Sequence, residues 1–256
     1  FYMCFAVAIF SSMGIAFAAN LFTLFIFYEL LTLSTYPLVT HSGKPEAVRA
    51  GRIYLGILLT TSICFLLSGI IATYYVTGSI DFRLSGVMAG KVPDWLGGIL
   101  LFLFMYGIGK AALMPIHFWL PAAMVAPTPV SALLHAVAVV KAGVFTVVKV
   151  IVYIFGIDYL AALPWTQVLV YISGGTIIVA SLVALRADNL KRRLAYSTIS
   201  QLSYVVMAAA LMTPLAIMGA AIHIAAHAFG KITLFFAAGS IYTAAHKTEV
   251  SQLDGI

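Results

Sequence analysis

The sequence predicts an all-α integral membrane protein, and two observations lead to this fold class. Of its 256 residues, 63% are hydrophobic and only 9% are charged, whereas about a quarter of the residues in an ordinary soluble domain are charged. The apolar runs continue over about 20 residues, which is long enough to cross a membrane as helices. They also lack the alternating pattern of a membrane β-barrel.

About eight transmembrane helices are expected. The first two are separated only weakly, because the chain is nearly continuously apolar from Phe1 to Val39 and only Gly14 and Asn20 suggest a break. The expected helices span residues 1–18, 20–40, 52–76, 95–115, 130–155, 164–186, 192–212 and 214–243.

The fourth expected helix is followed by a proline-rich break. Each proline removes a backbone donor and disfavours helix in the residue before it. We therefore expect a broken helix after Lys110, either as a re-entrant segment at membrane depth or as a loop outside the membrane. The prolines concerned are Pro115, Pro121, Pro127 and Pro129.

The basic residues predict the orientation of the chain. With the expected helices, the loops at residues 40–52 and 186–193 fall on one side and, together with Lys247, collect eight Lys or Arg. The opposite side has three, namely Arg83, Lys91 and Lys149. Cytoplasmic loops of membrane proteins are enriched in Lys and Arg. The net charge of +6 is therefore interpreted as a topology signal of a multi-pass protein of the inner (cytoplasmic) membrane, and nucleic acid is not an expected partner.

The two cysteines give no sign of a cofactor or metal site. Cys4 and Cys64 do not have the C-x-x-C spacing of a metal or redox centre, so they are interpreted as buried apolar residues, and no cofactor or metal is expected. The chain begins at Phe1 within an apolar run and ends in a polar SQLDGI. It is therefore interpreted as a fragment of a longer chain.

Three ionisable residues lie where lipid-facing helices would not place them. Glu29 is about 15 Å from either end of its expected helix at residues 20–40. Lys141 is near the middle of the expected helix at residues 130–155. Neither side chain is therefore long enough to reach water at the membrane surface. Lys110 stands five residues before Pro115. Its ammonium could instead extend to the nearby interface.

A polar ladder is expected on the last helix. In HIAAHAFGK, the residues His223, His227 and Lys231 recur every four positions, and helical geometry aligns such positions on one stripe at about 6 Å per step. His135 precedes Lys141 by six residues and points about 120° away from it. It is therefore only an accessory candidate, as is His117, which could equally cap the broken backbone.

These buried charges predict a proton path. A charge at the bilayer centre costs about 2.5–3.5 kcal/mol unless it faces a polar interior and is paired. Burial disfavours the charged form of a lysine, and a nearby carboxylate favours it. We expect Lys110 to pair with Glu29, and Lys141, His227 and Lys231 to be the next proton carriers, joined by waters and by hydroxyl groups. The hydroxyls considered are Tyr36, Ser131, Ser203 and Thr233.

Four segments carry a resemblance to a known family. They are FYELLTLSTYPL, GKAALMPIHFWLPAAMVAPTPVSALLHAVAVVKAGVF, LKRRLAYSTISQLSY and HIAAHAFGKITLFFAAGSIY. They resemble the antiporter-like superfamily, which comprises the A and D subunits of Mrp-type monovalent cation/proton antiporters and the proton-pumping subunits of respiratory complex I and related hydrogenases.

The resemblance implies both a fold and roles for the residues. Glu29 corresponds to the family's helix glutamate, Lys110 to the lysine of the broken helix and Lys141 to its central lysine. His223, His227 and Lys231 correspond to the ladder toward the second half-channel. The implied fold has two five-helix repeats of inverted topology, with residues 1–155 as the first repeat and residues 156–256 as the start of the second.

The function implied first is that of a proton-translocating subunit of an Mrp-type antiporter, which works beside other membrane subunits and exchanges protons for Na⁺ or K⁺. The alternative is a proton-pumping subunit of NADH:quinone oxidoreductase or of a membrane-bound hydrogenase. In either case no redox site of its own is expected. A haem- or quinone-bearing redox subunit, a small-solute carrier and a structural scaffold remain further alternatives. The sequence leaves open the exchanged cation, the driving reaction and the flanking subunits.

Overall fold

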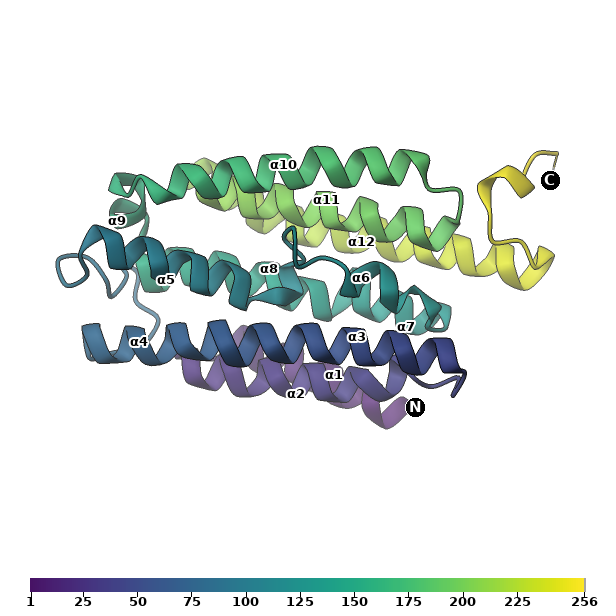
Figure 1. The fold of residues 1–256 in the computed structure, drawn as a ribbon, viewed down its shortest axis with the longest axis horizontal. Helices are drawn as coiled ribbons and strands as arrows, with labels where there is room; N and C mark the ends of the chain where they lie inside the picture. Colours follow the sequence, from purple (N-terminus) through teal and green to yellow (C-terminus); the bar gives the residue numbers. More distant parts are fainter. Residues whose placement is uncertain (256) are drawn as a thin grey trace.

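The structure, a computed structural model, describes residues 1–255, which form a helical bundle (Figure 1). No β-strand occurs within these residues. The α-helices are α1 (Tyr2–Phe17), α2 (Leu21–Val39), α3 (Pro45–Thr61), α4 (Ser68–Thr77), α5 (Asp94–Gly107), α6 (Trp119–Ala122), α7 (Thr128–Ala132), α8 (Val139–Val150), α9 (Ile157–Ala162), α10 (Trp165–Arg186), α11 (Leu190–Ala210) and α12 (Pro214–Ala245). Short π-helical segments are η1 (Ser62–Leu67), η4 (Leu133–Val137) and η5 (Ile151–Phe155), and 3₁₀ turns are η2 (Gly109–Ala111), η3 (Ala123–Val125) and η6 (Val250–Gln252).

Each of the eight expected segments contains helix, and two of them form long rods through π-helical joints. Five helical stretches are long and apolar enough to cross a membrane: Leu21–Val39, Pro45–Thr77, Thr128–Phe155, Trp165–Arg186 and Pro214–Ala245. The apolar helices α1 and α5 are shorter, with 16 and 14 residues. The expectation of an all-α, multi-pass membrane protein is confirmed.

Polar side chains fix where several helices begin. The Asn20 side chain accepts a hydrogen bond from the Thr23 backbone N–H at 2.8 Å and so caps the start of α2. Asn189 caps α11 in the same way. The weak signal at Asn20 therefore marks a real helix boundary, because a side-chain acceptor satisfies a donor that the first helical turn leaves free.

The helices fall into two groups with a third between them. In Figure 1, α1 to α4 lie on one side of the bundle, α10 to α12 lie on the other, and α5, α8 and the proline-rich break lie between. The break and α8 are therefore placed where both groups contact them. This central layer holds two of the expected site lysines, Lys110 and Lys141.

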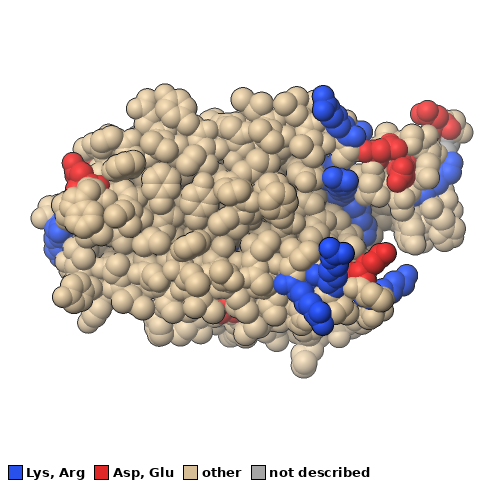
Figure 2. All heavy atoms as spheres, in the orientation of Figure 1, with Lys and Arg blue, Asp and Glu red and all other residues tan. Residues whose placement is uncertain are grey.

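The surface separates into an apolar band and charged ends. In Figure 2 most charged atoms gather near the end that carries the C-terminus, and the wide band between the two ends is almost entirely uncharged. The α2–α3 and α10–α11 connections lie at that same end (Figure 1). This agrees with the expectation that the two basic loops share one side of the membrane.

The prediction for the cysteines is only partly correct. Cys4 is half-buried, but Cys64 is exposed on the outside of the bundle. Large apolar neighbours such as Ile63 and Ile71 are also exposed. In a lipid-facing helix an apolar side chain needs no burial, so the composition could not distinguish a core position from a lipid-facing one.

Candidate functional site: a buried lysine and histidine chain

Lys110 lies inside the helix break. The helix α5 ends at Gly107, Lys110 occupies the 3₁₀ turn η2, and Ala112 then adopts a left-handed conformation with φ of 54°. The Trp119 indole N–H donates to the Gly109 carbonyl at 3.0 Å and holds the turn. The regular helix therefore ends earlier than the expected 95–115, and the break begins just before Lys110 rather than after it.

The Lys110 ammonium is fully buried and held by α2. Its Nζ donates to the Tyr28 backbone carbonyl at 2.8 Å and to the Thr32 Oγ1 at 2.6 Å. It also lies 3.1 Å from the centroid of the Tyr28 ring. The Lys110 backbone N–H donates to the Tyr28 hydroxyl at 3.1 Å. Tyr28 and Thr32 therefore fix both the backbone and the ammonium of this residue.

The expected ion pair between Lys110 and Glu29 is not formed in this structure. Both Glu29 carboxyl oxygens are buried and make no hydrogen bond with the described residues. The prediction failed because sequence spacing placed the two residues at similar depth but could not show that a backbone carbonyl and a hydroxyl of α2 would bind the ammonium instead.

Lys141 is bonded across the bundle to His227. Lys141 belongs to α8 and His227 to α12, both are at most 8% exposed, and the lysine Nζ forms a hydrogen bond with the imidazole Nδ1. One nitrogen must donate and the other must accept. The contact is therefore favourable when one proton lies between the two nitrogens, so that the group that holds it donates and the other accepts.

The ladder on α12 is confirmed as a geometric feature. His223 and His227 stack with ring centroids 6.0 Å apart and planes 8° apart. One further turn along, the Lys231 Nζ donates to the Ser197 hydroxyl at 2.7 Å and to the Leu194 carbonyl at 3.1 Å. Both acceptors belong to α11, so the stripe predicted from the spacing faces the interior between α8 and α11.

The two accessory histidines are also buried. His135 lies in the π-helical segment η4 and packs against the Phe235 ring of α12 at 5.3 Å, and neither of its ring nitrogens has a hydrogen-bond partner among the described residues. The π-helical segment changes the angle around the helix axis between His135 and Lys141. The sequence estimate assumed a regular α-helix and could not include this change. His117 lies within the break, and its ring lies near Tyr196 of α11.

A glycine joins the two lysine regions. Gly143 lies two residues after Lys141 on α8, and a Cβ atom at Gly143 would overlap the carbonyl group of Lys110. The backbone of the break therefore rests directly on α8. A change in the position of Lys110 is transmitted to the helix that carries Lys141, because packed backbones do not yield independently.

Three of the four hydroxyl groups that the sequence indicated donate to backbone carbonyls rather than to a site lysine or histidine. Ser131, Ser203 and Thr233 donate to backbone carbonyls four or five residues earlier in their own segments. Thr32 and Ser197 contact the lysines instead. The only signal for Thr32 was its position one turn from Glu29, and YSTIS around Ser197 offered several equivalent hydroxyls.

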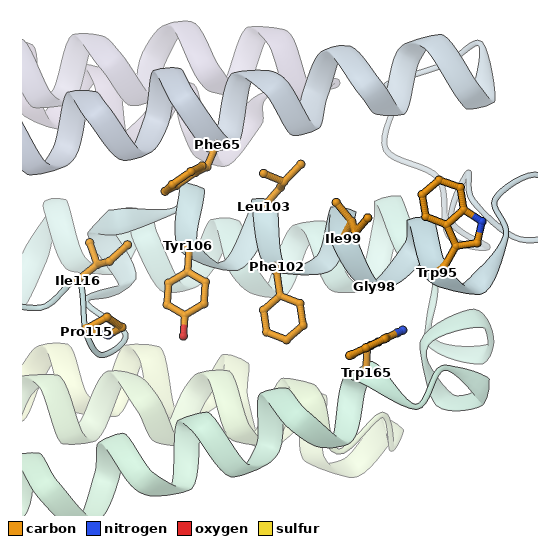
Figure 3. Close-up of a pocket in the computed structure, with 10 residues that line it drawn as sticks. All are labelled: Phe65, Trp95, Gly98, Ile99, Phe102, Leu103, Tyr106, Pro115, Ile116 and Trp165. Atoms are coloured by element: carbon orange, nitrogen blue, oxygen red, sulfur yellow. The ribbon is translucent and has the colours of Figure 1, made fainter.

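An apolar groove beside α5 lies away from this chain of polar groups. Figure 3 shows its walls, which come from α5, η1, the start of α10 and two residues of the break. Its volume is about 520 Å³. No carboxylate, ammonium or imidazole lines it, so the candidate proton path does not run through it. The lining residues are Phe65, Trp95, Gly98, Ile99, Phe102, Leu103, Tyr106, Pro115, Ile116 and Trp165.

With this geometry established, comparison with known proteins decides the family. Residues 18–256 match the family described as "NADH:quinone oxidoreductase/Mrp antiporter, TM". The chain belongs to this family. The resemblance expected from the sequence motifs is therefore confirmed.

Named relatives of this antiporter family match most of the chain. NAD(P)H-quinone oxidoreductase subunit 5 of the organellar chromatophore of Paulinella chromatophora is 34% identical over 240 residues, which cover 90% of this chain and 34% of the relative. NADH-quinone oxidoreductase subunit N of Desulforudis audaxviator is 33% identical over 259 residues, covering all of this chain and 51% of the relative. The chain therefore spans about a third to a half of these relatives.

Two solved structures share the fold. A chain of the Mrp complex from Dietzia sp. has a TM-score of 0.85 at 30% identity, with coverage of 95% of this chain and 26% of that chain. A chain of the membrane-bound sulfane sulfur reductase, an archaeal respiratory membrane complex, has a TM-score of 0.86 at 27% identity, with coverage of 99% and 52%.

Proposed function

We propose that this chain is the proton-translocating part of an antiporter-like membrane subunit. The observation that carries the proposal is the bond between Lys141 of α8 and His227 of α12 in the interior of the bundle. A charge at this depth is costly and marks ion or proton pathways by default. Two nitrogen bases from separate helices, in direct contact, are suited to pass a proton from one helix to the other.

The proposed path begins at Glu29 and Lys110 and continues through Lys141. From there it follows α12 by His227 and Lys231, with His223, His135 and His117 as accessory groups. The two lysine regions are linked mechanically by the contact of Gly143 with the break and chemically by waters that enter between them. A proton that arrives at one region changes the electrostatic potential at the other, because buried charges are screened less than charges exposed to solvent.

The arrangement of the polar groups supports this path over a haem site. Bis-histidine haem ligation needs two imidazoles on opposite sides of the iron, whereas the rings of His223 and His227 stack on one face of one helix. Within residues 1–255 no group of three or more His, Cys, Asp or Glu is placed to hold a metal ion.

The proposal extends to the surrounding complex. The relatives at 33–34% identity are named as quinone oxidoreductase subunits, so a proton-pumping subunit of a complex I-type enzyme is the first candidate. An Mrp-type cation/proton antiporter subunit, which the sequence motifs indicated first, is the second and is favoured by the Dietzia structure. In either case we propose that the chain lies beside other membrane subunits, that residues 1–155 form the first repeat and residues 156–256 the start of the second, and that the basic loops at 40–52 and 186–193 face the cytoplasm.

Substitution of the two central groups tests the proposed function. In the assembled complex in proteoliposomes, Glu29→Ala and Lys141→Ala should each abolish proton-coupled transport while the abundance of the complex stays near normal. Lys149→Ala, which removes the other lysine of α8, is the matched control and should keep transport. Full transport in Lys141→Ala would refute the path, and loss of assembly would show instead that the charges hold the fold together.

The driving reaction distinguishes the two candidate complexes. Proteoliposomes that contain the purified complex are given either a sodium gradient or a reduced electron donor with a quinone. Proton movement driven by the sodium gradient alone identifies the antiporter, and proton movement only during quinone reduction identifies the oxidoreductase.

A further inference from the structure

The Lys110 ammonium is bound by groups that carry no negative charge. Its Nζ has two oxygen acceptors within 2.8 Å, the Tyr28 carbonyl and the Thr32 hydroxyl, and the face of the Tyr28 ring 3.1 Å away. All three residues are fully buried. Backbone carbonyls, hydroxyls and aromatic faces are established partners of a lysine ammonium. This combination is therefore a complete binding position for the ammonium.

This position lies beside Glu29 on the same turn of α2. Tyr28 and Thr32 are one turn apart and share a helix face, whereas Glu29 is the next residue after Tyr28 and points about 100° away around the axis. The Glu29 carboxylate is buried, and both its oxygens are without a hydrogen-bond partner in the described part of the chain. A buried acceptor left without a donor is costly.

We propose that Tyr28 and Thr32 form an alternative seat for the Lys110 ammonium, so that they act as positioning residues that compete with Glu29 for the lysine. When the Lys110 ammonium is bound in the seat, the Glu29 carboxylate is free to take up a proton. When the ammonium pairs with Glu29, the seat is empty. The Tyr28 hydroxyl and the packing of Gly143 hold the Lys110 backbone, so the exchange moves the four-carbon side chain rather than the backbone.

The division of labour between the two residues follows from their contacts. The Tyr28 hydroxyl holds the backbone of the break, and its carbonyl and ring hold the ammonium. The Thr32 hydroxyl contacts only the ammonium and the carbonyl of Tyr28. Removing the Thr32 hydroxyl therefore weakens the seat and leaves the break intact.

Infrared difference spectroscopy of the complex tests the seat. The Glu29 band is identified as the carboxyl signal that disappears in Glu29→Gln, and it is compared in wild type, Thr32→Val and Thr32→Ser. We expect Thr32→Val to raise the ratio of ion-paired to unpaired Glu29 about tenfold, because a hydrogen bond to a charged group is lost from the competing position. Thr32→Ser restores the hydroxyl and should give the wild-type band.

Two further variants separate positioning from structure. Thr73→Val is the matched control, because Thr73 is also buried and its hydroxyl donates only to the Gly69 carbonyl of the same rod. It should leave the Glu29 band unchanged. Tyr28→Phe keeps the ring and carbonyl but releases the break, so it should lower thermal stability without the shift of Thr32→Val. An unchanged Glu29 band in Thr32→Val, or an equal shift in Thr73→Val, overturns the proposal.

The effect on transport rests on the proposed function, and the two are distinguished by different variants. If the seat regulates transport, Thr32→Val should slow proton-coupled transport about tenfold, matching the change in the band ratio, and Thr32→Ser should restore it. If Glu29→Ala retains full transport, the proposed function fails regardless of Thr32. If Glu29→Ala loses transport while Thr32→Val gives both a wild-type band and a wild-type rate, the function stands and the seat is refuted.

Discussion

The two lysine regions of this protein bind their ammonium groups by different chemistry. Lys110, in the break, lies on a carbonyl and a hydroxyl of α2, with a carboxylate on the neighbouring residue. Lys141, on α8, is bonded to an imidazole, and no carboxylate takes part in the hydrogen bonds of Lys141, His227 or Lys231 among residues 1–255.

The difference indicates how a proton is handled in each region. Near Lys110 an acidic group is available, so the ammonium can be stabilised as a full charge when it turns toward Glu29. Around Lys141 and His227 several bases are crowded together, and like charges at short range are unfavourable. Under the proposed function, the second region therefore favours a single shared proton, which passes between bases rather than being held by an opposite charge.

The largest expected effect comes from placing a carboxylate beside Lys141, as Glu29 lies beside the Lys110 region. His227→Glu places a carboxylate beside Lys141, and the resulting ion pair should hold the lysine in its charged form. Proton-coupled transport in proteoliposomes should fall on the order of 100-fold, the scale of a lost proton-transfer group.

His227→Gln is the neutral comparison for that variant. The glutamine retains a hydrogen-bond acceptor for Lys141 but carries neither a charge nor a titrating proton, so it removes the proton carrier without trapping the lysine charge. Proton-coupled transport should again fall on the order of 100-fold. Wild-type transport in His227→Glu would contradict the view that this region must remain free of carboxylates.

The next effect concerns the contact that joins the two regions. Gly143→Ala should push the break away from α8, because the new methyl group overlaps the Lys110 carbonyl, and overpacking of this kind costs about 1–3 kcal/mol. A lower thermal unfolding temperature and slower transport are expected together. Gly174→Ala on α10 is the matched control, because nothing lies within 4 Å of a Cβ there. Equal effects of Gly143→Ala and Gly174→Ala would show that the contact at Gly143 does not couple the Lys110 and Lys141 regions.

A smaller effect is expected where Lys231 meets α11. Ser197→Ala removes one of two oxygen acceptors of the ammonium, which is worth about 1 kcal/mol or a few-fold in transport rate. Ser173→Ala on α10 removes a buried hydroxyl that bonds only to the Leu169 carbonyl of its own helix. It should leave the transport rate unchanged, and a similar loss in both variants would assign Ser197 a packing role only.

The smallest effect is expected where the C-terminal segment packs against the α10–α11 connection. Hydrogen bonds from the Ser251 hydroxyl and backbone N–H lower the pKa of Asp188. A carboxylate with a lowered pKa contributes its contact fully above its ordinary pKa and loses it as the pH falls through the lowered value. Acidification should therefore release the segment near Ser251 only below the usual carboxyl range.

A nitroxide attached through Asp254→Cys, in a chain whose two native cysteines are replaced by alanine, measures this release as increased mobility. Ser251→Ala removes the hydroxyl donor and should move the transition to higher pH. A transition that is insensitive to Ser251→Ala would assign the release to another group.

The sequence by itself determined the helical class, the approximate helix boundaries and the identity of the buried ionisable residues. Each follows from local chemistry: apolar runs of sufficient length form helices in lipid, prolines end them, and a fourfold spacing aligns His223, His227 and Lys231 on one face. The family resemblance added the expected roles of these residues, and the match over residues 18–256 confirmed the family.

Only the tertiary structure decided which groups touch. The sequence paired Lys110 with Glu29 because opposite charges attract, yet the ammonium lies on Tyr28 and Thr32. It could not place Lys141 on His227, which is 86 residues away. Hydrogen-bond partners between helices depend on helix rotation, on π-helical joints and on where a break begins, and each of these is fixed by the packing of the whole bundle rather than by the spacing within one helix.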